Sequence, residues 1–230
     1  MKKLVIVPTY NEIENMQMLL PALMGLSENF DVLVVDDASP DNTAGFVYDF
    51  GKSNSRVHLF LRGPKQGLGK AYIAGFKWGI ERGYEAMVEM DADFSHRPVD
   101  LVQLLQKLEQ HDVVIGSRYV EGGSTVNWGL LRKLISRGGS LYSRMVLGYP
   151  VRDWTGGFNA WRTPVLQAIG LDQIKSNGYS FQIELKYKAQ KRGYKVLEVP
   201  IVFEDRRVGQ SKMSMKIVLE AFYKVWMIRF

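Results

Sequence analysis

Short apolar runs alternate along the chain with longer segments in which apolar residues recur at helical spacing. The short runs are rich in β-branched and aliphatic residues and are bounded by turn residues, which favours buried parallel strands at 4–7, 32–35, 57–61, 86–89 and 113–115. Segments 13–24 and 98–109 repeat apolar residues every three or four positions, and Pro98 suits a first helical turn. The alternation predicts an α/β fold with a mostly parallel, Rossmann-like sheet flanked by helices, whose ligands bind beyond the carboxyl ends of the strands.

The C-terminal segment 213–230 is predicted to be an amphipathic helix. Charged residues recur on one face at Lys216, Glu220 and Lys224. Another face carries the apolar side chains of Met215, Val218, Leu219, Phe222, Val225 and Trp226. Such a face either packs on the domain core or lies in a membrane interface with its basic groups near lipid phosphates.

Length and composition narrow the classes of protein. A chain of 230 residues with 46% hydrophobic content is long enough for one well-filled domain and short for two, so we expect a single domain over 1–230. The absence of cysteine excludes disulfides and thiolate metal sites and suits a reducing compartment. A net charge of +6 favours anionic partners, such as nucleotides, nucleic acid or an anionic membrane face. The first apolar run is too short for a signal peptide, and no stretch has the roughly 18 to 20 apolar residues of a spanning helix.

Carboxylates gather where three of the predicted strands end. The segments concerned are 8–12 (PTYNE), 36–41 (DDASPD) and 89–93 (EMDAD). In a parallel sheet these loops would converge on one edge, where so many carboxylates cannot lose water cheaply without a cation or a hydrogen-bonding ligand. Asp91 and Asp93 could both reach one hard cation, and Mg2+ or Mn2+ prefers such oxygen ligands and bridges phosphates. An ordinary turn is the alternative for Asp-x-Asp alone, but the two further acidic loops favour a metal.

Residues 63–70 (GPKQGLGK) are similar to a phosphate-binding loop without completing one. The first glycine of that motif is missing, and Ala71 stands where a Ser or Thr would hold Mg2+, which excludes the P-loop NTPases. Gly67 and Gly69 instead suit a tight turn into a helix from near Ala71, whose N-terminus could face a phosphate. An ordinary turn is the alternative. The three histidines are too scattered along the chain to indicate a zinc site.

Several segments of the sequence, taken together, indicate one protein family more specifically than any single motif does. They are 8–12 (PTYNE), 35–41 (VDDASPD), 67–71 (GLGKA), 90–96 (MDADFSH), 116–119 (GSRY), 153–158 (DWTGGF) and 203–212 (FEDRRVGQSK). With Arg132 and Ser136, this set resembles the inverting GT-A glycosyltransferases, most closely the dolichol-phosphate and polyprenol-phosphate mannose synthases, over nearly the whole chain. The resemblance implies a GT-A fold and transfer of a hexose, usually mannose from GDP-mannose, to the phosphate of a polyisoprenoid lipid with inversion at the anomeric carbon.

The resemblance also implies roles for individual residues. The nucleoside pocket would be formed by Pro8, Tyr10, Glu12 and Asp37. The diphosphate would lie at Asp91, Ala92 and Asp93, of which Asp91 and Asp93 would bind Mg2+ or Mn2+, and a loop would close over it with Arg206 and Lys212. The acceptor phosphate would be held by Arg118, Arg132 and Ser136. The catalytic residues are expected to be Asp93, Arg118 and Arg132. Ser95 stands where some members of the family carry a glutamine near the metal.

A phosphate acceptor removes the need for a strong protein base, because a phosphate monoester is already anionic near neutral pH. Inverting transferases that use hydroxyl acceptors often present a Glu-Asp pair, whereas the matching segment 154–158 (WTGGF) has only Asp153 nearby. We therefore expect catalysis by positioning and by metal and arginine stabilisation of the leaving diphosphate. A lipid acceptor also favours the membrane interpretation of segment 213–230. The expected location is the cytoplasmic face of a membrane, bound peripherally, alone or through a membrane-anchoring partner, with no nucleic acid involved.

Within the single domain, the Gly-rich stretch 116–129 is expected to divide a nucleotide-sugar-binding half, 1–116, from an acceptor half, 117–212, followed by the helix 213–230. One alternative keeps the mechanism and changes the donor to UDP-glucose, because guanine and uracil pockets can share the same carboxylates. Another is a non-catalytic scaffold subunit that binds a sugar nucleotide. A nucleotidyltransferase is disfavoured, since no glycine-rich, arginine-containing loop opens the chain near residue 10.

Overall fold

The computed structural model describes residues 1–176, 178–205 and 215–230, without the side chains of Tyr179 and of residues 215–221. Its centre is a seven-stranded sheet in the order β3-β2-β1-β4-β7-β5-β8, in which β7 alone runs antiparallel. The strands are β1 (Lys3–Thr9), β2 (Asp31–Asp36), β3 (Val57–Leu61), β4 (Ala86–Glu89), β5 (Val113–Ser117), β7 (Asn159–Arg162) and β8 (Val196–Pro200). The five predicted strands and the mostly parallel sheet are confirmed.

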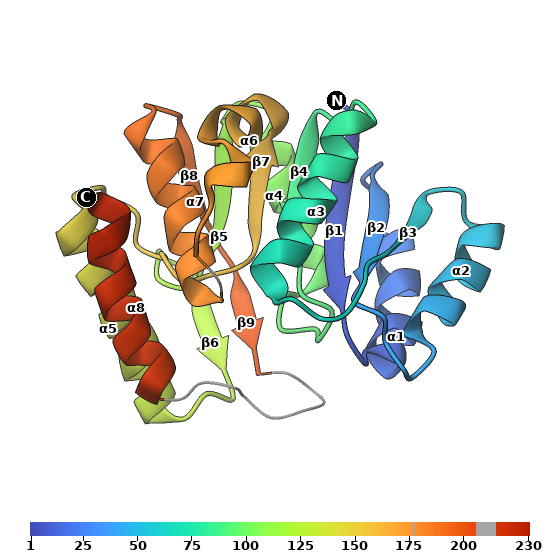
Figure 1. Cartoon of the computed structure of the whole chain (residues 1–230), viewed down its shortest axis with the longest axis horizontal. Coiled ribbons are helices and arrows are strands. Elements are labelled where there is room, and N and C mark those ends of the chain that lie inside the picture. The colour runs from blue at the N-terminus through green and yellow to red at the C-terminus, as the bar shows by residue number, and fades with distance from the viewer. Residues whose placement is uncertain (177, 206–214) are drawn as a thin grey trace.

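Helices cover both faces of this sheet (Figure 1). Alternation along β1 sends Leu4 and Ile6 into one apolar core and Val5 and Val7 into the other. The core of Val5 and Val7 is closed by α1 (Ile13–Met24), α2 (Thr43–Ser53) and α4 (Pro98–Lys107). The opposite core is closed by α3 (Leu68–Glu81), α6 (Thr163–Ile169) and α7 (Tyr179–Lys191). The helices predicted at 13–24 and 98–109 are therefore confirmed, with α4 ending two residues early.

The glycines of segment 63–70 act through packing. Gly67 has a φ of 100°, in the left-handed region that favours glycine, and α3 begins directly after it, three residues before the predicted start. A Cβ on Gly69 would lie 3.0 Å from the ring of Phe181, so this glycine lets α3 approach α7 closely.

The remaining elements lie outside the seven-stranded sheet. A two-stranded parallel sheet pairs β6 (Ser124–Val126) with β9 (Val202–Glu204), and a short 3-10 helix, η1 (Leu171–Gln173), precedes α7. The long α5 (Leu130–Leu147) and α8 (Met215–Arg229) lie side by side, at the opposite end from α2 (Figure 1). Across the described ranges, no helix is long and apolar enough to span a bilayer.

The predicted C-terminal helix is confirmed as α8, but its apolar residues do not share one environment. Val225 is 1% exposed and joins the core under α5 and α7, and the Phe222 ring lies 4.1 Å from the Tyr142 ring of α5. Trp226 is 51% exposed. The helix thus packs on the domain, and it leaves part of its apolar surface open.

Candidate active site

The loops after β1 and β2 are fastened to each other at the carboxyl edge of the sheet. Asp36 accepts hydrogen bonds from Thr9 Oγ1 (2.7 Å) and Ser39 Oγ (2.6 Å). Asp41 accepts from the backbone N–H of Ile13 (3.1 Å) and from Thr43 Oγ1 (2.6 Å). These two carboxylates are therefore structural, and they shape the loops that carry the expected nucleoside residues.

The expected nucleoside residues lie in these loops. Asp37 is buried and forms an ion pair with Arg62 (3.2 Å). Glu12 accepts a hydrogen bond from Asn15 Nδ2 (2.7 Å). Tyr10 is 37% exposed, with Lys65 Nζ 4.0 Å from its ring centre, and Pro8 is half-buried in β1. An exposed aromatic ring beside a cation and two carboxylates offers stacking and hydrogen bonding to a ligand.

The same edge of the sheet carries strained backbone. Ala38, with a φ of 55°, and Phe94, with a φ of 60°, adopt the left-handed conformation that costs non-glycine residues about 1 kcal/mol or more. Ala38 belongs to the loop after β2, and Phe94 follows the Asp91–Asp93 pair. Such strain gathers at ligand-binding loops, where it fixes the direction of the backbone.

Asp91 and Asp93 are both held by neighbouring side chains. The buried Tyr72, from α3, donates its hydroxyl to Asp91 Oδ1 (3.0 Å). Ser95 donates to Asp93 Oδ1 through its backbone N–H (3.1 Å) and its hydroxyl (2.5 Å). Ser95 thus supports Asp93, and Ala92 is buried between the two acids. The contact from Tyr72 was not predicted, because nothing in the spacing of the motifs brings α3 to this loop.

His96 supports the same loop as a neutral ring. It is 1% exposed, stacks on Phe158 at 4.7 Å, and accepts a hydrogen bond at Nδ1 from the Asp91 backbone N–H (3.1 Å). Burial lowers the pKa of His96 to about 4, against the opposing effect of the Asp93 carboxylate. Near neutral pH the ring therefore carries its proton on Nε2 and positions Asp91.

Arg118 is buried in a bidentate pair with Asp153. Its Nε and one terminal nitrogen donate to the two carboxylate oxygens at 2.8 and 2.6 Å, and its backbone N–H adds a third bond at 2.9 Å. Burial alone would raise the pKa of Asp153, but the Arg118 guanidinium outweighs it and holds that pKa at about 2. Asp153 is therefore ionised, fully paired and unsuited to serve as a general base.

The other expected acceptor residues surround Arg118. The Trp128 ring lies 4.1 Å from the Arg132 guanidinium and 5.5 Å from that of Arg118. Ser136, on α5, accepts a hydrogen bond from the Tyr119 hydroxyl (2.7 Å). Arg132 forms an ion pair with Asp205 (2.7 Å), and its Nε is a buried donor with no hydrogen-bond partner among the described residues. The sequence-predicted set Arg118, Arg132 and Ser136 thus forms one cluster.

An aromatic chain joins this cluster to the Asp91–Asp93 loop. Phe203 of β9 lies edge-on to both His96 (5.3 Å) and Trp128 (5.2 Å). The two groups of predicted residues are therefore neighbours in the structure. The remaining two, Arg206 and Lys212, lie outside the residues that the structure describes.

A buried polar network lies behind the site and was not predicted. Lys186 of α7 donates from Nζ to the carbonyl oxygens of Asp153 and Gly156, both at 2.8 Å, and burial lowers its pKa to about 8 against the nearby Asp153. Glu89, at the end of β4, accepts from Trp161 Nε1 (2.9 Å) and Gln182 Nε2 (2.8 Å). The sequence signal that could have indicated this network is Glu89, a charged residue at the end of an otherwise apolar strand.

Glu89 makes stability depend on pH in a direction that can be tested. Burial raises the pKa of Glu89 from 4.5 to about 7, so between these values the folded protein binds more protons than the unfolded chain. The contribution of Glu89 to the free energy of unfolding is therefore expected to fall as the pH rises through this window, by an amount on the order of 3 kcal/mol. The lowered pKa of His96 makes the contribution of that residue rise with pH up to about 6.5.

Urea unfolding at pH 5 and 7.5, with EDTA present, measures this effect. Glu89→Gln should remove the falling contribution, so its free energy of unfolding should rise from pH 5 to 7.5 relative to that of the wild type. Glu81→Gln, at an exposed position, should keep the wild-type dependence. An unchanged pH dependence in Glu89→Gln would rule out Glu89 as the source.

Comparisons with known proteins identify the family of this chain. The sequence profile of the family described as "Glycosyl transferase family 2" matches residues 4–170. Undecaprenyl-phosphate mannosyltransferase of Micrococcus luteus is 49% identical, over 98% of this chain and 93% of its own length. Polyprenol monophosphomannose synthase of Mycolicibacterium smegmatis is 45% identical, over 99% of this chain and 88% of its own.

Solved structures show the same fold at low sequence identity. Glucosyl-3-phosphoglycerate synthase from Mycobacterium tuberculosis, in complex with UDP, has a TM-score of 0.69 at 16% identity, over 99% of this chain and 79% of that one. A mannosyltransferase from Pyrobaculum calidifontis, in complex with GDP-Man and Mn2+, has a TM-score of 0.59 at 17% identity, over 99% and 72%. The predicted GT-A fold is confirmed. Since the family profile covers most of the chain and two relatives match nearly all of it, the protein belongs to glycosyl transferase family 2 and is a glycosyltransferase.

Proposed function

We propose that this glycosyltransferase moves mannose from GDP-mannose to a polyprenyl phosphate, with the help of a divalent cation. The observation that carries the proposal is the cluster of Arg118, Arg132 and Ser136 next to the Asp91–Asp93 loop, in a chain close in sequence to two enzymes named for polyprenyl-phosphate mannosyl transfer. In this proposal, residues 1–116 bind the donor, residues 117–212 bind the acceptor, and segment 213–230 faces the membrane.

The donor would lie along the carboxyl edge of β1, β2 and β4. Tyr10, Glu12 and Asp37, with Pro8 beneath them, would bind the nucleoside through stacking and through hydrogen bonds to the carboxylates. Asp91, Ala92 and Asp93 would lie against the diphosphate. Arg206 and Lys212 would approach it from the segment after β9.

The residues present fit a hard cation. In the described part of the chain no group of three or more His, Cys, Asp or Glu side chains could hold a metal ion. The proposed ligands are the pair Asp91 and Asp93, whose carboxylates stand in one loop directly after β4. Two carboxylates leave coordination positions for phosphate oxygens, which is how Mg2+ and Mn2+ usually bind nucleotides. When bound, such a cation would neutralise charge on the leaving diphosphate.

The chain's own residues would position the acceptor and need supply no base. An anionic phosphate oxygen of the lipid can attack the anomeric carbon directly, while the bond to the diphosphate breaks. Asp153 is paired with Arg118 and its pKa is about 2, which supports a mechanism without a carboxylate base at this position. The positive charges of the Arg118 and Arg132 guanidinium groups would hold the acceptor phosphate in line for the displacement.

Membrane association would bring the enzyme to its lipid substrate. The neighbouring helices α5 and α8, with the residue after α8, carry many exposed apolar side chains: Leu130, Leu131, Leu134, Leu141, Met145, Phe222, Tyr223, Trp226, Met227 and Phe230. Apolar helical surfaces with flanking cations and an aromatic residue at the boundary are typical of peripheral membrane binding. We propose that this surface rests on the cytoplasmic face of a membrane.

The test is transfer of labelled sugar to a polyprenyl phosphate in detergent, with Mg2+ or Mn2+, using GDP-mannose and UDP-glucose in parallel. The proposal requires a lipid product from GDP-mannose that disappears with EDTA. A lipid product formed only from UDP-glucose would show that the donor is UDP-glucose. If neither donor gave a lipid product, the proposed acceptor would be rejected.

Tyr72→Phe tests whether support of Asp91 matters for the metal. The variant removes only the hydroxyl that donates to Asp91 Oδ1, so it should fold normally and need about tenfold more Mg2+ or Mn2+ for half-maximal transfer. Metal titrations of the initial rate measure this. Tyr84→Phe is the matched control, because it removes a hydroxyl that donates to Asp31, and it should leave the metal requirement unchanged.

A further inference from the structure

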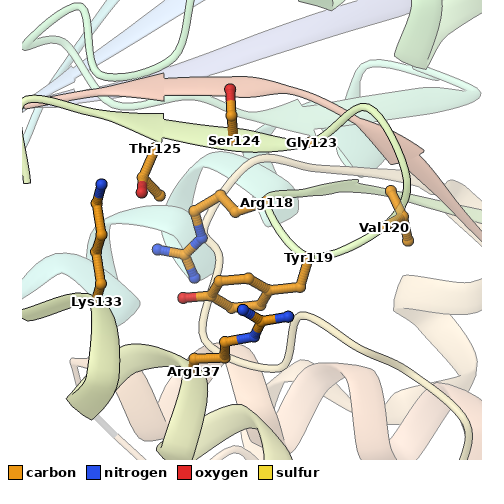
Figure 2. A pocket seen from close by; sticks show the side chains of 8 residues that line it. All are labelled: Arg118, Tyr119, Val120, Gly123, Ser124, Thr125, Lys133 and Arg137. Atoms are coloured by element: carbon orange, nitrogen blue, oxygen red, sulfur yellow. The ribbon is translucent and has the colours of Figure 1, made fainter. Parts of the chain in front are cut away.

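A pocket of about 340 Å³ lies between the loop after β5 and the flank of α5. Its lining includes Arg118, Tyr119, Thr125, Lys133 and Arg137. Figure 2 shows the polar ends of Arg118, Tyr119 and Lys133 around one space, with Arg137 beside the Tyr119 ring. The pocket adjoins the expected acceptor residues, because Arg118 lines it and Tyr119 donates to Ser136.

The charges of this pocket are not balanced within the protein. Arg118 is paired with Asp153, whereas Lys133 and Arg137 form no ion pair with any residue in the described ranges. No Asp or Glu is part of the lining. The pocket therefore has two cations in excess, which suits a doubly charged phosphate monoester.

The position of these cations on α5 connects the pocket with the apolar surface. Lys133 and Arg137 are one helical turn apart, so their side chains lie in one row. Helical periodicity places this row between the exposed row of Leu130, Leu134 and Leu141 and the buried row of Ser136 and Ser140. An amphiphile with its chain on the leucines would place its charged end at this row.

We propose that Lys133 and Arg137 form a capture site for the phosphate monoester of the acceptor lipid, at which the headgroup binds before or while it contacts Arg118. The inference rests on the proposed lipid-phosphate acceptor and adds two binding residues to it. Both side chains are exposed, so their replacement should leave the fold intact.

Steady-state kinetics with farnesyl phosphate as a short acceptor give the first test. Lys133→Gln and Arg137→Gln should each raise the acceptor KM about tenfold, as expected for loss of a charge-assisted contact, with kcat and the KM for GDP-mannose near wild type. Arg144→Gln is the matched control, because it removes the same charge from the same face of α5, two turns beyond the pocket. Two results would overturn the proposal: an acceptor KM within twofold of wild type in the Lys133→Gln/Arg137→Gln double variant, or a rise of the acceptor KM in Arg144→Gln as large as that in the two single variants.

Equilibrium binding separates this inference from the proposed function. Wild type should bind farnesyl phosphate more tightly than dihexanoyl phosphatidylglycerol, a phosphodiester, and the Lys133→Gln/Arg137→Gln double variant should lose that preference while Lys133→Arg keeps it. This result without any sugar transfer would support the site and reject the proposed reaction. Equal weakening of both lipids would identify a general phospholipid contact and overturn the assignment to the acceptor, as would the absence of farnesyl phosphate binding to wild type.

Discussion

Replacing Asp93 with alanine is expected to lower sugar transfer by about a thousandfold or more. Asp93 is one of the two carboxylates expected to hold the cation against the diphosphate, and it is 8% exposed at the end of a strained loop. Loss of this carboxylate would weaken cation binding and leave charge on the leaving group unbalanced. The loss is measured as the initial rate of sugar transfer from labelled GDP-mannose at a saturating acceptor concentration. Repeating the measurement at a tenfold higher Mn2+ concentration shows whether added metal restores any activity.

The alanine variant alone does not separate charge from loop structure, because Asp93 Oδ1 also accepts two hydrogen bonds from Ser95. Asp93→Asn keeps an oxygen for those bonds and removes the charge. It should unfold at nearly the wild-type temperature and still lose most of its activity. Ser95→Ala should have the opposite profile, with a looser loop and a much smaller loss of transfer. If Asp93→Asn kept a tenth or more of wild-type transfer with the same metal dependence, Asp93 would not be a metal ligand.

The central fold could be predicted because local pattern and tertiary packing agree there. Strands such as 32–35 are continuous apolar runs, which is what a strand buried on both faces requires, and α1 has the bounds that its periodicity indicates. The antiparallel β7 could not be predicted in the same way. Its four residues have no alternation of their own, and their place between β4 and β5 depends on pairing with distant strands.

The site residues that could be predicted from the sequence are those that belong to a recognisable motif. Asp91 and Asp93 could be chosen from the sequence because a pair of carboxylates after a strand has a chemical meaning of its own. Tyr72 could not, since its role exists only where α3 crosses the Asp91 loop. The same holds for Lys186, which is fully buried whereas Lys188 and Lys191, the other lysines of its helix, are not. Contacts that arise only from tertiary packing cannot be recognised from the spacing of residues in a single sequence.

Replacing Arg118 is the second substitution with a large expected effect, and it should lower both the stability of the protein and the rate of sugar transfer. Arg118→Met would leave the fully buried Asp153 without its partner, and loss of one member of a buried pair costs about 3–5 kcal/mol of the free energy of unfolding. Transfer should also fall by about a hundredfold, because the positive charge of Arg118 is expected to help hold the acceptor phosphate. Urea unfolding and acceptor kinetics on the same preparation measure the two parts.

The double variant Arg118→Met/Asp153→Asn separates these parts. Removing both charges avoids an uncompensated buried carboxylate. The asparagine oxygen can accept only one of the two backbone N–H groups, of residues 118 and 156, that bond to different oxygens of Asp153, so part of the lost stability should return. If Arg118 binds the acceptor phosphate, transfer should stay low although the double variant is more stable than Arg118→Met, with the loss concentrated in the acceptor KM. Recovery of transfer together with stability would instead show that Arg118 serves only to hold the 153–156 turn, and the phosphate would then have to be bound by Arg132 and the cations of α5.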